Sequence, residues 1–226
     1  WLNKGGVWKE ILVDDNFPVL PGHQGPPQFA FTSTEENEIY VQLLEKAYAK
    51  LFGYYYAING GMPSDALRDL TGAPVEHIND PQELRDVEHI WRKVREADER
   101  GWVMAAGVIG GTGSGGGEVL RPDGLHEGHA YALINTAEVM DSYGRPARIL
   151  QIRNPWGQGE WNGDWGDNSD KWTRELREQF SSNIRNNGLF WISIEDFCRT
   201  FGDLSICKVE PNNVYNAIPI QSNPGT

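Results

Sequence analysis

Residues 127–157 read EGHAYALINTAEVMDSYGRPARILQIRNPWG and contain two strand-like apolar stretches on either side of a short acidic loop. The first stretch, 129–135, begins with His129, and the second, 147–153, is followed directly by Asn154. Antiparallel neighbours joined by a short connection place the start of one strand beside the end of the other. We therefore expect the side chains of His129 and Asn154 to meet.

This pair of residue types suits nucleophilic catalysis. An Asn carbonyl can hold one nitrogen of a neutral imidazole without adding charge, while the other nitrogen faces the reacting group. An uncharged partner fits a Cys–His pair, in which the thiolate already stabilises the imidazolium. Spacing alone leaves a structural alternative open, because Asn-Pro is a common turn opener. No such partner singles out the other histidines, His23, His77, His89 and His126.

Composition excludes several classes of protein. The 226 residues are 39% hydrophobic and 11% aromatic, as in a globular chain, and no apolar run approaches the length of a membrane span. A net charge of −12 argues against a nucleic-acid partner, which would require clustered cations. Cys198 and Cys207 lack the spacing of metal ligands and are interpreted as buried free thiols. Free thiols favour an intracellular location, and we expect the cytoplasm.

Hydrophobic periodicity changes part-way along the chain, from mainly helical to mainly strand-like. We predict one strand at 7–15, then helices at 33–53, 64–72 and 80–100, then strands at 102–109, 129–135, 147–153, 189–193 and 204–210. The pattern indicates an α+β fold in which a helical part is hinged to a mainly antiparallel β part. The glycine-rich stretch 110–124 lacks the Gly-Lys-Ser/Thr ending of a phosphate-binding loop and is interpreted as a mobile loop beside a site.

Seven blocks of the sequence resemble the calpain family of papain-like cysteine proteases, in the family's order. They are LLEKAYAKLFG (43–53), DLTG (69–72), GHAYAL (128–133), QIRNPWG (151–157), EWNGDW (160–165), GLFWISIEDF (188–197) and LSICKVEP (204–211). The resemblance implies a papain-like calpain protease core, with His129 as the catalytic histidine and Asn154 as its orienting asparagine. It implies that Trp156 covers their hydrogen bond and obstructs the cleft until calcium realigns two subdomains.

The resemblance also divides the chain. It implies that residues 1–60 are the C-terminal part of the first, Cys-bearing subdomain, that 61–212 form the second subdomain with the catalytic His and Asn, and that 213–226 are a tail. Papain-like enzymes place the nucleophilic Cys roughly 130–150 residues before the His, which here falls before Trp1. We therefore expect the nucleophile in the rest of the calpain core, upstream of this chain, and expect this chain alone to be inactive.

Two functions remain open. The first is a calcium-regulated cysteine endopeptidase that hydrolyses peptide bonds of a polypeptide substrate, with this chain supplying His129 and Asn154. The second is a non-catalytic calpain-homology scaffold or interaction domain, in which the pair is a remnant. The presence of His129, Asn154 and Trp156 favours the enzyme, and the residue at the nucleophile position would distinguish the two.

A calcium site is suggested by the acidic segment 159–170, GEWNGDWGDNSD, because calcium prefers six to eight oxygen ligands. The resemblance implies that Glu160 and Asp167 are ligands of a second-subdomain calcium ion and that Glu38 is a ligand of a first-subdomain one. Asn187 and Leu189, however, stand where the family has acidic residues. We expect Ca²⁺ to bind weakly at best, the alternative being a solvated acidic loop.

Overall fold

The computed structural model describes residues 1–19, 39–110, 118–180 and 187–212. The chain divides into two compact units, one containing Trp1–Gly72 and the other Ala73–Asn213. This division falls after Gly72, further along than the predicted hinge at residue 60. The predicted subdomain boundary stays a prediction, and the predicted tail lies outside the described residues.

The first unit combines a short antiparallel ribbon with helices. The ribbon is β1 (Leu2–Lys4) paired with β2 (Val7–Lys9), and the helices are α1 (Tyr40–Phe52), the single turn η1 (Tyr55–Ile58) and α2 (Pro63–Thr71). The predicted strand at 7–15 is too long, because β1 ends its pairing with β2 at Lys9. The helix predicted at 64–72 is α2, which begins one residue earlier with Pro63 at its first position.

Polar and aromatic contacts connect the ribbon to the helices of this unit. The buried carboxylate of Asp69 accepts hydrogen bonds from Lys4 Nζ at 3.0 Å and from the Tyr48 hydroxyl at 3.2 Å. Burial, together with the nearby Asp69 charge, raises the pKa of Tyr48, so its phenol stays protonated and donates. Gly72 ends α2 at a φ of 70°, and a Cβ there would lie 2.7 Å from the Trp8 ring. Only glycine satisfies both conditions.

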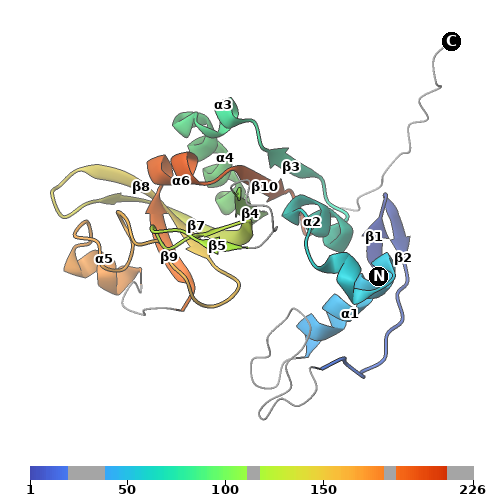
Figure 1. Ribbon diagram of the computed structural model, residues 1–226. Helices are drawn as coiled ribbons and strands as arrows, with labels where there is room; N and C mark the ends of the chain where they lie inside the picture. The colour runs from blue at the N-terminus through green and yellow to red at the C-terminus, as the bar shows by residue number, and fades with distance from the viewer. Residues whose placement is uncertain (20–38, 111–117, 181–186, 213–226) are drawn as a thin grey trace. The chain divides into compact units, whose positions relative to one another are not determined.

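The second unit is built on a six-stranded antiparallel sheet with the strand order β3-β10-β4-β7-β8-β9 (Figure 1). Its strands are β3 (Val75–Ile78), β4 (Val103–Val108), β7 (His129–Met140), β8 (Pro146–Arg153), β9 (Leu189–Ser193) and β10 (Asp203–Cys207), and β5 (Val119–Leu120) pairs with β6 (His126–Glu127) in a separate ribbon. Its helices are α3 (Pro81–Leu84), α4 (Val87–Arg100), α5 (Arg174–Gln179) and α6 (Ile194–Thr200). The predicted α+β class with a mainly antiparallel sheet is confirmed.

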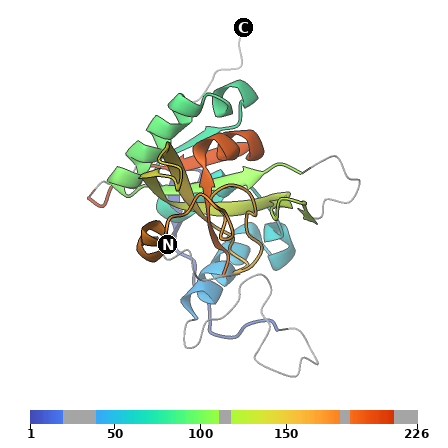
Figure 2. The same cartoon turned by 90° about the vertical axis from the view of Figure 1, so that its left-hand side faces the viewer.

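Helices α4 and α6 cover one face of this sheet (Figures 1 and 2). The apolar face of α4 buries Ile90, Val94 and Ala97 in a core that includes strand residues Ile152 and Leu204. Because strand side chains alternate between faces, Ile149 points to the opposite face, where it packs with three tryptophans, Trp165, Trp172 and Trp191. The sheet is therefore buried on both faces near β8 and β9.

The region predicted as one helix from 80 to 100 forms two helices. Asp80 caps α3 by accepting a hydrogen bond from the Gln82 backbone at 2.7 Å, and Asp86 caps α4 by accepting one from the His89 backbone at 3.0 Å. Each Asp starts its own helix, because its carboxylate satisfies backbone N–H groups of the first turn. Within the described ranges, no helix has the length and hydropathy needed to cross a bilayer.

Candidate functional site

His129 and Asn154 come from adjacent strands of the six-stranded sheet. His129 is the first residue of β7 and lies opposite Val108 of β4. Asn154 directly follows β8, and its backbone N–H donates to the Gly188 carbonyl at 2.7 Å. Strands β7 and β8 are antiparallel neighbours, so the beginning of one and the end of the other lie together.

The two side chains meet as the sequence predicted. His129 Nε2 lies 2.8 Å from Asn154 Oδ1. His129 is 7% exposed and Asn154 is fully buried at 0%, so water does not compete freely for this contact. A buried hydrogen bond of this kind fixes the orientation of the imidazole ring.

The surrounding backbone fixes the Asn154 amide. Its Oδ1 also accepts the Trp156 backbone N–H at 3.0 Å, and its Nδ2 donates to the Gly159 carbonyl at 3.2 Å. Gly159 has a φ of 80°, and a Cβ at this position would lie 2.9 Å from the His126 ring. The close packing at Gly159 therefore supports the amide orientation that presents Oδ1 to His129.

Aromatic rings enclose the imidazole. The Trp156 ring centroid lies 4.1 Å from that of His129, and the Tyr131 ring meets His129 edge-on at 4.8 Å. The Tyr131 hydroxyl accepts the His126 backbone N–H at 2.8 Å, and burial raises the pKa of Tyr131, which keeps its phenol neutral. Trp156 is itself 46% exposed. Trp156 thus packs against His129 while part of its ring faces solvent, and its role in covering the His–Asn pair and obstructing the cleft stays a prediction.

Glu118 also contacts His129, which the sequence analysis did not predict. Its Oε1 lies 2.7 Å from Nδ1 of His129, the ring nitrogen that Asn154 leaves available. Glu118 lies within the stretch 110–124 that was interpreted as a loop beside a site, but no local pattern distinguishes it from its neighbours as a partner of His129. Residues 111–117 of that stretch lie outside the described residues.

Both cysteines are buried thiols that are not in a disulfide. Cys207 is 0% exposed at the end of β10, between β3 and β4. Burial, reinforced by the charges of Glu195 and Asp86, raises the pKa of Cys198 to about 12. A thiol with this pKa carries almost no thiolate near neutral pH.

The acidic residues predicted to bind calcium contact protein groups. Glu160 Oε1 accepts the backbone N–H groups of Asn187 at 2.7 Å and Gly188 at 2.9 Å. The Asp167 carbonyl accepts a hydrogen bond from Arg177 at 2.7 Å. Glu160 thus holds the turn before β9, and the backbone around Asp167 is held by a cation of the protein itself.

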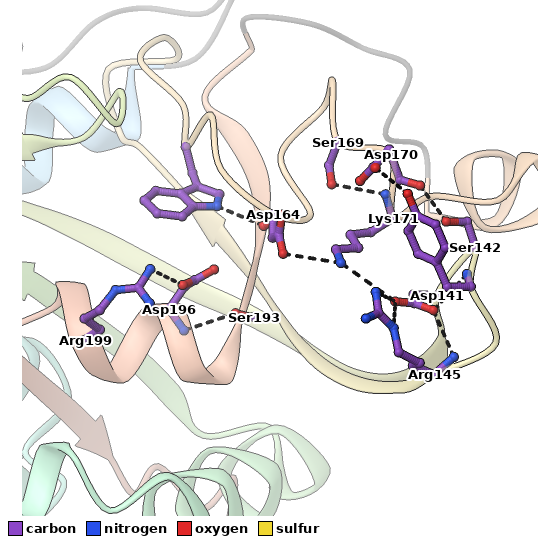
Figure 3. Close-up of polar contacts among 12 residues, drawn as sticks. Asp141, Ser142, Arg145, Asp164, Ser169, Asp170, Lys171, Ser193, Asp196 and Arg199 are labelled. Carbon is purple, nitrogen blue, oxygen red and sulfur yellow. Dashed lines mark hydrogen bonds and ion pairs between the residues drawn. The ribbon is translucent and has the colours of Figure 1, made fainter.

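Lys171 supplies a second cation to the same segment. Its Nζ lies 3.6 Å from Asp164 and 3.9 Å from Asp141, and Figure 3 shows it pointing between the two carboxylates. Asp141 is buried and is also bound by Arg145 at 3.0 Å. Lys171 therefore neutralises part of the negative charge of the acidic segment that suggested a calcium site.

In the described part of the chain, no three His, Cys, Asp or Glu side chains converge into a group that could hold a metal ion. Glu38, the remaining predicted ligand, lies outside the described residues. Calcium usually requires six to eight oxygen ligands. The described side chains of Glu160 and Asp167 therefore do not form a calcium site by themselves, and the expected weak binding stays a prediction.

Comparison with known proteins identifies a family that contains this sequence pattern. The model of the "calpain family cysteine protease" matches residues 1–208. The chain is 38% identical over 212 residues to the calpain-type cysteine protease DEK1 of Zea mays, covering 91% of this chain and 9% of that protein. It is 35% identical to calpain clp-1 of Caenorhabditis elegans and to the calpain-2 catalytic subunit of Bos taurus, covering 92% of this chain and 26% and 29% of those proteins.

Proposed function

The chain belongs to the calpain family of cysteine proteases, and on this premise we propose that it supplies the histidine and asparagine of a calpain-type endopeptidase. The observation that carries the proposal is the buried contact of 2.8 Å between His129 Nε2 and Asn154 Oδ1. The chain spans 9% of the length of its plant relatives and 26–33% of the animal ones. The activity proposed is therefore that of a larger protein.

In this proposal a cysteine outside the chain is the nucleophile. Its thiolate adds to the carbonyl carbon of a peptide bond in a polypeptide substrate, and the His129 imidazolium gives its proton to the departing amine. The neutral imidazole then takes a proton from water, which attacks the acyl-enzyme and releases the thiolate. Asn154 keeps the ring in one orientation throughout, because its amide is held by Trp156 and Gly159.

The two cysteines of the chain support an external nucleophile. Cys198 has a pKa of about 12, and Cys207 is fully buried between two strands. The reduced state of both thiols, neither of which is in a disulfide, also supports an intracellular place of action, which we propose together with the activity.

Calcium has at most a minor role in the second unit under this proposal. Glu160 Oε1 already accepts two backbone N–H groups, which leaves fewer lone pairs of this carboxylate for a cation. We propose a dissociation constant no tighter than roughly 10⁻⁴ to 10⁻³ M, as for low-charge sites. Calorimetry on the chain and on Asp167→Asn tests this, and micromolar binding would contradict it.

Mutagenesis of the intact protease tests the catalytic proposal. His129→Ala should lower kcat for peptide hydrolysis by about 10²- to 10⁴-fold, the contribution of general acid–base catalysis. Asn154→Ala should cause a loss of up to about 10²-fold, because a misplaced ring transfers protons poorly.

His89→Ala is the matched control, because His89 pairs with Glu83 at the surface at 2.9 Å and has no role in the site. It should leave kcat unchanged. The 226-residue chain without the nucleophile should not cleave casein. Activity that survives His129→Ala would favour the non-catalytic scaffold as the role of this domain.

A further inference from the structure

Both ring nitrogens of His129 have oxygen partners. Nε2 lies 2.8 Å from Asn154 Oδ1, and Nδ1 lies 2.7 Å from Glu118 Oε1. The side chain of His129 is 5% exposed, whereas that of Glu118 is 38% exposed. The ring is thus held between a fully buried amide and a carboxylate that reaches it from the solvent side.

The Asn154 contact determines one proton of the ring. Asn154 Oδ1 accepts the Trp156 N–H, and Nδ2 donates to the Gly159 carbonyl, so the amide cannot be reversed without losing both bonds. Oδ1 is therefore an acceptor, and Nε2 of His129 must donate. A neutral imidazole carries one N–H, and here that N–H is on Nε2.

The Glu118 contact then requires a second proton. With Nε2 protonated, a neutral ring would present a lone pair at Nδ1, and an ionised carboxylate has no hydrogen to offer it. One proton must lie between Nδ1 and Oε1. An imidazolium bound to a carboxylate satisfies this with a charge-assisted hydrogen bond, and 2.7 Å is a normal length for one.

We infer that Glu118 is the resident counterion of the His129 imidazolium and acts as an internal competitor of the nucleophile. This inference rests on the proposed function, in which a thiolate pairs with the imidazolium at the nitrogen that Asn154 leaves available. Glu118 provides one negative charge at that nitrogen. The thiolate and Glu118 cannot both bind Nδ1, so Glu118 must withdraw for catalysis. It is a positioning residue that sets the state of His129 while the nucleophile is not engaged.

The exposure of Glu118 makes this competition reversible. Ion pairs with an exposed partner are weak, because solvent screens the charges and the side chain loses freedom. The His129–Asn154 bond, in contrast, is fully buried. Displacing Glu118 therefore leaves the ring orientation unchanged and frees only Nδ1.

Nuclear magnetic resonance of the ¹⁵N-histidine-labelled chain tests the proton count. At neutral pH we expect both ring nitrogens of His129 to be protonated. In Glu118→Gln the Nδ1 proton should be lost while Nε2 keeps its proton, because the new amide can donate to the Nδ1 lone pair.

The control is Glu83→Gln, which removes an equally exposed partner from His89 and should leave the His129 signals unchanged. A singly protonated His129 in the unmodified chain would overturn the inference. So would an Nδ1 signal that is the same with and without the Glu118 carboxylate.

Activity of the intact protease tests the competition. Glu118→Gln should raise kcat/KM by about two- to fivefold, the range that one exposed ion pair spans, and Glu83→Gln should not change it. Unchanged or lower kcat/KM in Glu118→Gln would overturn the competitor role. An unmodified protease without turnover would instead overturn the proposed function, and the proton measurement on the chain would then decide whether Glu118 is the counterion.

Discussion

The paired ends of strands β7 and β8 differ from the acidic segment 159–170 in the partners that their polar side chains have. At the strand ends, His129 and Asn154 bind each other at 2.8 Å and leave one ring nitrogen directed toward a side chain at the surface. In the acidic segment, Glu160 binds backbone amides and Asp164 lies beside Lys171. At the strand ends a ring nitrogen faces a surface carboxylate, whereas in the acidic segment Glu160 and Asp164 bind groups of the protein itself.

The difference follows from how each backbone is held. Sheet hydrogen bonds set the position of β7 against β8. The register therefore determines which residues at the adjacent strand ends lie together. An irregular loop has no such register, and its carboxylates bind the nearest N–H groups or cations. Acidic composition alone thus does not determine how many carboxylate oxygens remain available to a metal ion.

The largest expected effect comes from weakening the sheet under the strand-end pair. Ile152 lies on β8 two residues before Asn154 and is 0% exposed in the main core. Ile152→Ala should lower the free energy of unfolding by about 2–5 kcal/mol, because it leaves a cavity. Urea denaturation measures this. Met140→Ala is the control, since Met140 on β7 is 54% exposed, and it should change stability by less than about 0.5 kcal/mol.

A smaller effect distinguishes the two acids of the acidic segment. Glu160→Ala removes the acceptor of two backbone N–H groups and should cost about 1–3 kcal/mol. Asp164→Ala removes an exposed partner of Lys171 and should cost less than about 1 kcal/mol. Thermal unfolding of both variants checks the order. Equal losses would show that Glu160 is not a structural acceptor and would reopen a metal-binding role for it.

The smallest expected effect is on the pH dependence of stability. Burial alone would raise the pKa of Asp141, but hydrogen bonds from Arg145 and the Tyr143 backbone outweigh it and hold this pKa below its usual value. A lowered folded-state pKa stabilises the protein above the unfolded value of about 3.9. This stabilisation is lost as the pH falls through the folded pKa. Asp141→Asn should therefore flatten the acid limb of a stability curve measured by denaturant titration.

Asp203 provides a control of opposite sign. Burial raises its pKa, so its contribution is present below the unfolded value and is lost as the pH rises through the folded value. Compared with the unmodified protein, Asp203→Asn should therefore gain more stability near neutral pH than in acid. If both variants flattened the same side of the curve, the assigned directions would be wrong for one of the two residues.

The parts of the fold that were predicted correctly depend on local signals. Strand β9 was predicted with its observed ends, and the ends of β4 and β8 differ by one residue, because apolar runs bounded by turn residues mark them. The meeting of His129 and Asn154 followed from a short connection between neighbouring strands. The family followed from GHAYAL and RNPWG, and the match over residues 1–208 confirmed it.

Other features depend on residues far apart in the chain. β3 was missed because four residues between two helices have no distinctive period, and it is a strand only through its pairing with β10. The break between α3 and α4 was missed because Asp86 is equally compatible with a helix interior and with a cap. In the same way, the loop 110–124 was expected beside a site, but no pattern within it singles out Glu118 as the residue that reaches His129.

The sequence by itself determined the α+β class, the family, and the residue types that could perform acid–base chemistry, since these depend on local pattern and composition. The tertiary structure decided which partner each polar group has. In the folded chain β10 lies between β3 and β4, and Nδ1 of His129 contacts Glu118. Glu160 accepts hydrogen bonds from the backbone amides before β9. The physical reason is that a side chain's chemistry is set by its type, whereas its partner is set by the groups that long-range packing brings within about 3 Å of it.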